Sequence, residues 1–203
     1  KVGNGQPLSF SVPTGNFGDI YAGYLAKKLG LPIDKLIVAT NKNDILHRAI
    51  SGGDYSQKKV EETNTPSMDI QIASNFERQI FESLGRSSIK LEHIMESFAI
   101  NGHYYFSDEV VSDLQSIYHS YSVSNDQTLK TINNFKNKYN YLADPHTATG
   151  LHVLDKEKSD EPIVSLACAH SAKFGEAIEK ATGLRPMLPK NIKIVFDKEE
   201  KFT

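Results

Sequence analysis

The residues best suited to chemistry lie at 11–19, where Ser-Val-Pro-Thr-Gly-Asn-Phe-Gly-Asp joins a strand-like stretch to a helix. Gly15 and Gly18 have no Cβ, so the backbone can approach a ligand closely there. Unpaired amides at the start of a helix, reinforced by the helix dipole, favour an anion. The same spacing also occurs in turns made only for packing. The segment lacks the Gly-Lys-Ser/Thr ending of a nucleotide loop, which argues against a nucleoside triphosphate.

Alternating strand and helix signals surround this turn. Strand patterns at 8–12 and 36–39 are separated by a helical pattern at 18–29, and a further helix is expected from Asn43 to Gly52. Such alternation predicts a parallel sheet with helices on its faces. Residues 53–66 are polar and are interpreted as a loop. A helix is then expected from Ser67, as N-cap, to Gly85, with Ile72, Phe76 and Ile80 on its apolar face.

The second half is predicted to add a helical insertion at 85–140 before the alternation resumes. Its helical patterns lie near 89–98, 109–118 and 127–139. A helix after Pro145, a buried strand at 163–167 and a helix at 173–182 capped by Gly183 follow. The predicted fold class is therefore α/β, an open, mostly parallel sheet with helices on both faces plus a helical insertion.

Composition excludes several classes of partner. The 203 residues carry 23 Lys and Arg against 25 Asp and Glu, a net charge of −2, which gives no general attraction to nucleic acid or an anionic membrane. No apolar run reaches the length of a membrane span. The single cysteine, Cys168, fits a reducing compartment, so a cytoplasmic location is expected. No His or Cys spacing indicates a metal site.

The segment at 11–19 resembles the cofactor-phosphate loop of threonine synthases of the bacterial and fungal type, which are fold type II pyridoxal-phosphate enzymes. Further blocks of this family follow in the same order, and together they extend the resemblance over nearly the whole chain. They are Ala-Thr-Asn-Lys-Asn-Asp-Ile-Leu at 39–46, Thr-Pro-Ser-Met-Asp-Ile at 65–70, Ser-Asn-Phe-Glu-Arg at 74–78, Asp-Pro-His-Thr-Ala-Thr-Gly at 144–150 and Ala-His-Ser-Ala-Lys-Phe at 169–174.

The resemblance implies pyridoxal 5'-phosphate as cofactor and O-phospho-L-homoserine as small-molecule substrate, converted with water into L-threonine and phosphate. It assigns the cofactor phosphate to Gly15, Asn16, Phe17, Gly18 and Asp19, although the Asp19 carboxylate is expected to point away from the anion. Cys168 is expected to face the pyridine nitrogen, at a place where the family usually has threonine. No carboxylate is evident near Cys168 in sequence, so a largely neutral pyridine ring is expected.

Other polar residues allow two interpretations each. Asn75 and Arg78 are candidates for substrate binding, although a surface ion pair of Arg78 with Glu77 or Glu82 is the commoner arrangement. Asn41 and Asn43 follow the second strand at the edge where open α/β sheets bind ligands, and helix capping is favoured for Asn43. His146 is interpreted as structural.

No catalytic residue is assigned in the chain, because no lysine lies in a Schiff-base motif of the family. The chain begins at Lys1 without a methionine, and residues 1–203 are expected to be a C-terminal, cofactor-binding portion of a large domain. The lysine is expected in a missing N-terminal half, so the chain alone is predicted to be inactive. Two alternatives stay open, a phospholyase of the same family that releases 2-oxobutyrate and a non-catalytic binding fragment.

Overall fold

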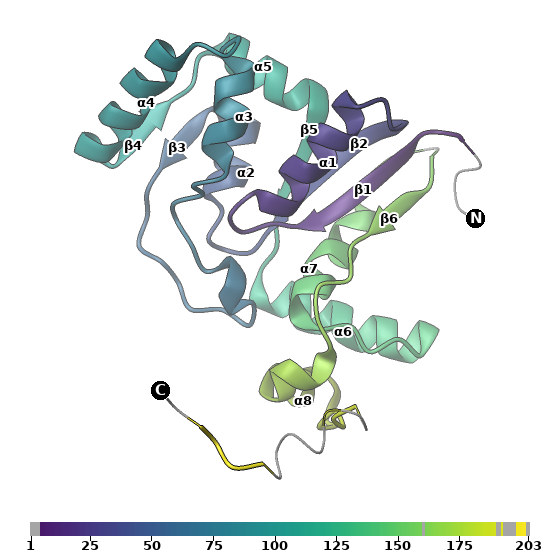
Figure 1. The fold of residues 1–203 in the computed structure, drawn as a ribbon. Helices are drawn as coiled ribbons and strands as arrows, with labels where there is room; N and C mark the ends of the chain where they lie inside the picture. The colour runs from purple at the N-terminus through teal and green to yellow at the C-terminus, as the bar shows by residue number, and fades with distance from the viewer. Residues whose placement is uncertain (1–4, 160, 190–191, 193–197, 202–203) are drawn as a thin grey trace.

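A four-stranded parallel sheet organises the chain, as seen in a computed structural model that describes residues 5–159, 161–189, 192 and 198–201. The strands lie in the order β5-β2-β1-β6, and all three neighbouring pairs are parallel (Figure 1). Their bounds are β1 Leu8–Pro13, β2 Ile33–Thr40, β5 Tyr118–Ser122 and β6 Ile163–Ser165. The predicted open, mostly parallel sheet is confirmed.

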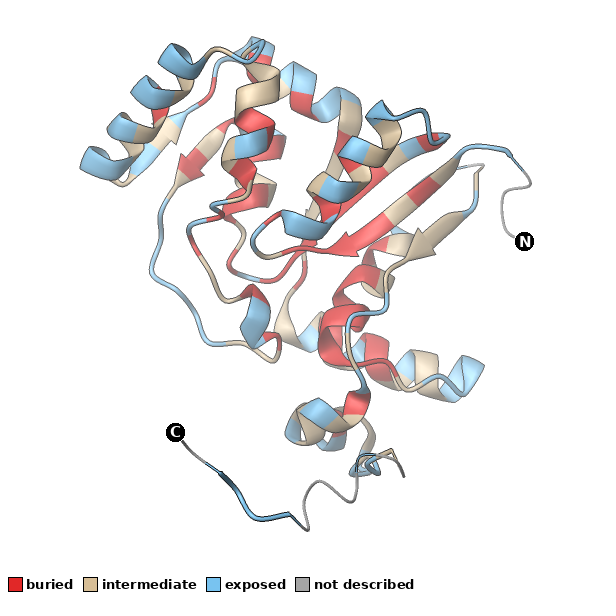
Figure 2. Ribbon diagram, viewed as in Figure 1, coloured by how far each residue is buried: buried red, intermediate tan, exposed pale blue. Residues whose placement is uncertain are grey.

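Helices cover both faces of this sheet because β2 is apolar on both sides. Leu36 and Val38 belong to the core shared with α1 (Gly18–Lys28) and α2 (Ile45–Gly52), whereas Ile37 and Ala39 pack on the opposite side. That opposite face carries α7 (Pro145–His152), and the buried residues of both layers are red in Figure 2. A run buried on both sides is typical of a parallel strand.

The remaining elements pack around these layers. The three helices expected at 85–140 are present, but the same range contains two strands that periodicity did not indicate. One of them, β5, is an edge strand of the main sheet, and the other pairs with β3 in an antiparallel ribbon. The further bounds are β3 Asp54–Ser56, β4 His103–Tyr105, α3 Phe76–Ser83, α4 Ser88–Asn101, α5 Asp108–Ile117, α6 Asn125–Tyr139, α8 Gly175–Thr182, η1 Pro66–Met68, η2 Val153–Asp155 and η3 Ser171–Phe174.

Two local expectations in the first half are wrong. The helix expected from Ser67 begins only at Phe76, and Ser67 lies inside the short 3-10 helix η1. Just after η1, the Asp69 carboxylate accepts hydrogen bonds from Asn41 and Asn43, so this backbone is tied to the sheet edge instead of continuing as a helix. The expected loop at 53–66 contains β3, which is too short and polar for its pattern to be recognised.

The order of the strands creates a crevice at one edge of the sheet. The chain passes from β1 to β2 and β5 on one side and then returns to place β6 on the other side of β1. At such a switch point the loops after the neighbouring strands diverge, and ligands of open α/β sheets bind outside the carboxyl ends there. The loops after Pro13 and Ser165 therefore flank the expected ligand position. None of the described helices is both long and apolar enough to span a membrane.

Close packing of α7 against the sheet generates a test of the fold. A Cβ on Gly150 would lie 2.9 Å from Ser165 Oγ and 3.0 Å from Pro13 Cγ. We expect Gly150→Ala to lower the free energy of unfolding in urea by about 1–3 kcal/mol, because the rigid proline ring cannot yield. Gly52→Ala is the control, since its Cβ would meet no atom within 4 Å and alanine favours a helix. Equal stabilities of the two variants would contradict this packing.

Candidate functional site

A pocket of about 370 Å³ lies at the switch point, outside the carboxyl ends of β1 and β6. Segments far apart in the sequence meet there, since residues 13–19 form one wall and residues 168–169 and 173–174 form the other. Residues 67–68, Asn75 and His146 complete the lining. The structure thus brings together the predicted cofactor residues of the turn at 15–19 with Cys168.

The backbone amides from Gly15 to Asp19 are available to a ligand. Within the described residues, none of these five amides donates a hydrogen bond, and no side chain caps the start of α1. Unpaired amides that line a pocket require a partner from solvent or ligand. Together with the dipole of an 11-residue helix they form an environment for an anion.

Phe17 holds this turn in place through its side chain. The residue has a φ of 71°, in the left-handed region that a non-glycine residue adopts only at a cost. Its ring is 1% exposed and packs edge-on against Phe76, with centroids 4.8 Å apart, and against Tyr118 at 5.4 Å. Because the ring is in the core, only the backbone of Phe17 is available to the pocket.

Neighbouring atoms leave little room for a side chain at either glycine of the turn. A Cβ on Gly15 would lie 2.9 Å from the carbonyl oxygen of Ser67, and one on Gly18 would lie 3.2 Å from Asn75 Nδ2. Asn16 Oδ1 accepts the amide N–H of Asn75 at 3.3 Å, which links the turn to the start of α3. The Gly-x-x-Gly spacing therefore serves packing as well as ligand approach.

The two candidate substrate residues differ in position. Asn75 lines the pocket, whereas Arg78 is exposed on α3 and is not part of the lining. The alternative ion pair of Arg78 with Glu82 is not formed either, because Glu82 pairs with Arg86 at 3.0 Å. The side chain of Asp19 is exposed at the pocket rim, in the first turn of α1.

A buried carboxylate lies beside Cys168, contrary to the expectation from sequence. Asp144, the N-cap of α7, is 1% exposed, and its Oδ2 accepts the amide N–H of Ala169 at 3.1 Å. Burial alone would raise the pKa of Asp144, but the adjacent His146 ring, the Thr147 hydroxyl and backbone amides lower it below its ordinary value. No sequence pattern links this carboxylate to Cys168, because 24 positions separate the two residues. The Asp-Pro pair is nevertheless a recognisable helix start.

His146 also belongs to the pocket, which its structural interpretation did not anticipate. Its side chain is 7% exposed, and its ring packs on Phe174 with centroids 4.8 Å apart. Nδ1 lies 3.3 Å from Asp144 Oδ1 but is not aligned for a hydrogen bond, and Nε2 has no partner among the described residues. Lys173 adds a positive charge to the lining opposite Asp19. Its only sequence signal was its place in the block at 169–174.

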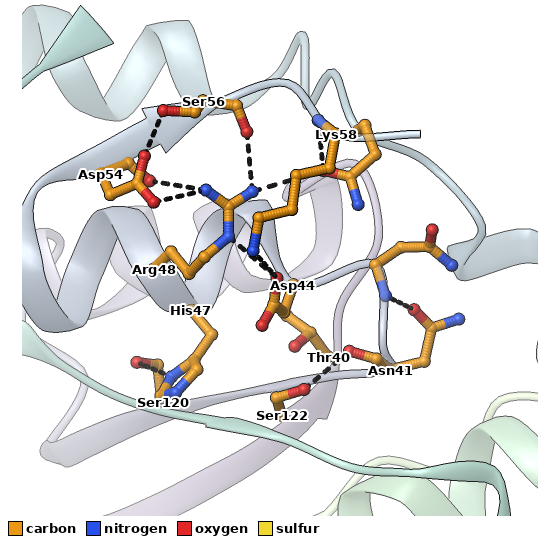
Figure 3. Close-up of polar contacts among 12 residues, drawn as sticks. Thr40, Asn41, Asp44, His47, Arg48, Asp54, Ser56, Lys58, Ser120 and Ser122 are labelled. Atoms are coloured by element: carbon orange, nitrogen blue, oxygen red, sulfur yellow. Dashed lines mark hydrogen bonds and ion pairs between the residues drawn. The ribbon is translucent and has the colours of Figure 1, made fainter. Parts of the chain in front are cut away.

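Asn41 and Asn43 lie at the sheet edge as expected, but they bind protein groups and do not line the pocket. Asp69 Oδ1 accepts hydrogen bonds from Asn41 Nδ2 at 2.7 Å and Asn43 Nδ2 at 3.0 Å. Asn41 Oδ1 in turn accepts the amide N–H of Asn43, the contact drawn at Asn41 in Figure 3. The capping role favoured for Asn43 is wrong, because Asp44 is the N-cap of α2. This network places residues 67–68 against Gly15 and so builds one wall of the pocket.

A second polar cluster nearby is structural. Arg48 Nη1 donates to Asp54 at 2.7 Å, its Nη2 donates to the carbonyl oxygen of Ser56 at 2.7 Å, and its Nε donates to Asp44 at 2.9 Å (Figure 3). The guanidinium thus joins α2 to β3 with most of its donors satisfied. Among the described residues no group of three or more His, Cys, Asp or Glu side chains is arranged to hold a metal ion.

Comparison with known proteins relates the chain to one family. A family profile described as "Threonine synthase, C-terminal" matches residues 147–203. The threonine synthase of Pseudomonas aeruginosa is 42% identical over 201 residues, which cover 98% of this chain and 43% of that protein. A pyridoxal-phosphate-bound threonine synthase from Brucella melitensis matches with a TM-score of 0.95 and 43% identity, over 98% of this chain and 43% of that one. The yeast threonine synthase structure matches with a TM-score of 0.89 and 33% identity, over 97% and 44%.

The Asp69 network generates a test of how the pocket wall is held. In Asp69→Asn, an N–H₂ group would replace one of the carboxylate oxygens that now accept hydrogen bonds from Asn41 and Thr63. Because donors would then face each other, we expect the free energy of unfolding to fall by about 1–3 kcal/mol. Asp126→Asn, in the exposed first turn of α6, is the matched control and should change stability by only a few tenths of a kcal/mol. Equal effects in urea unfolding would show that the network contributes no stability.

Proposed function

Because the chain corresponds in sequence and fold to the C-terminal part of threonine synthases, we propose that it is the cofactor-phosphate-binding portion of such an enzyme. The chain spans about two-fifths of the length of these relatives, 43% for the first two. The proposed reaction of the whole protein converts O-phospho-L-homoserine and water into L-threonine and phosphate. The proposed cofactor is pyridoxal 5'-phosphate.

The observation that carries this proposal is the set of unpaired amides from Gly15 to Asp19 in the pocket wall. A phosphate monoester close to two negative charges suits these donors and the helix dipole behind them. The turn contains no lysine, so the phosphate would be bound by backbone groups. Backbone amides alone would therefore recognise the phosphate, and the ligand need not be a nucleotide.

The opposite wall suits the other end of the cofactor ring. Cys168 would donate its thiol hydrogen to the pyridine nitrogen, and Asn75 would donate to the substrate from the α3 side of the pocket. Arg78 is a weaker candidate for substrate binding, since it lies outside the lining. When bound, pyridoxal phosphate supplies an electron sink for carbanions.

The lysine required for covalent attachment is proposed to lie outside these 203 residues. Lys173 is the only lysine lining the pocket among the described residues, and its Nζ lies 5.5 Å from the centroid of the Phe174 ring. We therefore propose that the chain alone binds the phosphate but has no turnover. Two expectations stay predictions. One is that residues 1–203 form a single portion of a large domain with a helical insertion at 85–140, and the other is that the protein is cytoplasmic.

Binding to the isolated chain can be tested with a ligand that cannot form a Schiff base. We expect pyridoxamine 5'-phosphate to bind more tightly than pyridoxamine, by about tenfold or more, because only the former carries a phosphate that can reach the amides. Binding of both ligands is measured by their fluorescence. Gly15→Ala should weaken this preference by displacing residues 67–68, whereas Gly52→Ala should preserve it. Equal affinity for the two ligands would contradict the assignment of the phosphate site.

Turnover distinguishes the proposed reaction from its alternatives. The protein extended to the length of its relatives should release threonine and phosphate in equal amounts from O-phospho-L-homoserine, whereas the 203-residue chain should release neither. Production of 2-oxobutyrate in place of threonine would select the phospholyase alternative. Ligand binding without turnover by the extended protein would favour the non-catalytic alternative.

A further inference from the structure

The N-terminus of α7 is joined to the Cys168 loop by a buried carboxylate. Asp144 Oδ1 accepts the amide N–H of His146 at 3.0 Å, an ordinary helix cap. Its Oδ2 accepts two further hydrogen bonds. One comes from the Thr147 hydroxyl in the same helix, and the other comes from the amide N–H of Ala169 in the loop, at 3.1 Å. One side chain therefore satisfies donors from two segments that lie about 25 residues apart.

Thr147 provides a second link between the same segments. While its hydroxyl donates to Asp144, its Oγ1 accepts the amide N–H of Cys168 at 2.9 Å. The side chains of both residues are buried, with 1% of Asp144 and 2% of Thr147 exposed. The hydrogen bond between these two side chains is buried, and those that they accept from the loop are partly buried, so that breaking them leaves poorly solvated groups without partners.

These links determine the course of the loop after β6. The strand ends at Ser165, and the amide N–H of Leu166 still donates to Ser11. The next two residues that line the pocket, Cys168 and Ala169, are held only by α7 through the hydrogen bonds of their amides. Without Asp144 and Thr147, no hydrogen bond among the described residues would hold the amides of Cys168 and Ala169.

We propose that Asp144 and Thr147 form a clamp that fixes the backbone of Cys168 and Ala169 and so positions the Cys168 thiol in the pocket as a hydrogen-bond donor. Both are positioning residues, since they act through the loop and do not line the pocket. The clamp deepens the function proposed above, on which the identity of the acceptor rests. Its geometry is a property of the chain and can be tested without cofactor.

The charges around Cys168 agree with this role. Cys168 is exposed, but partial burial of its sulfur raises the pKa of the thiol to about 11, with further contributions from the carboxylates of Asp144 on α7 and Asp19 on α1, while Thr147 acts in the opposite direction. His146 and Lys173 face the same pocket from α7 and η3, and His170 follows the loop. At neutral pH the sulfur carries its proton, as an ordinary thiol does, and can donate to a ligand.

Alkylation by iodoacetamide, an uncharged reagent, measures the clamp directly because Cys168 is the only cysteine. Asp144→Asn should raise the rate by about threefold per unit that the thiol pKa falls, because the thiolate fraction rises tenfold while its nucleophilicity decreases, and should move the rate-versus-pH profile to lower pH. Thr147→Val should move the rate-versus-pH profile to higher pH, the opposite direction from Asp144→Asn, because the Thr147 hydroxyl lowers the thiol pKa. Thr147→Ser keeps the hydroxyl and should restore the rate of the unmodified chain.

Ser124→Ala is the matched control, since Ser124 caps the neighbouring helix α6 and its side chain accepts the amide N–H of Gln127 in that helix. It should lose stability without changing the alkylation rate. Unchanged rates for folded Asp144→Asn and Thr147→Val, checked by circular dichroism, would overturn the clamp. If Asp144→Asn does not fold, the Thr147→Val and Thr147→Ser pair decides. Failure of pyridoxamine 5'-phosphate to bind would contradict the proposed function but leave these rates unaffected.

Discussion

The site depends on the burial of one aromatic ring at a strained backbone position. Phe17 has a φ of 71°, which costs about 1–3 kcal/mol for a non-glycine residue, and is held there by its contacts with Phe76 and Tyr118. Truncating a fully buried phenylalanine costs about 3–5 kcal/mol, so the burial of this ring offsets the backbone strain. The core therefore keeps the turn in the one conformation that leaves the amides of residues 15–19 unpaired at the pocket, so fold stability and ligand geometry share the same side chain.

The other wall is held by polar contacts, and the two walls meet because of the strand order. β6 lies next to β1 although some 150 residues separate them, which brings the loop after Ser165 opposite the turn after Pro13. Asp144 and Thr147 fix the first loop, while Asp69 and its asparagine partners fix residues 67–68 against Gly15. Both networks are at least partly buried, which strengthens their hydrogen bonds relative to those in water.

Sequence reasoning succeeded where a signal is local and failed where a long-range contact competes with it. The strands at β1 and β2 and the helix after Pro145 follow their apolar spacing and caps. The helix expected from Ser67 is absent because Asp69 is bound to Asn41 and Asn43. The sequence of β5 gives no strand signal, because Tyr118–Ser122 is mostly polar. Its pairing with β2 is what makes it a strand.

The chain's chemistry was largely determined by its sequence. The two glycines, the helix start behind them and Cys168 could all be recognised from residue type, spacing and family resemblance. The tertiary structure decided which side chains share the pocket, bringing in His146 and Lys173, leaving Arg78 outside and placing a carboxylate beside Cys168. The physical reason is that amide geometry and capping arise within a few residues. In contrast, the charge next to a thiol depends on which strands are neighbours, and no local pattern encodes that arrangement.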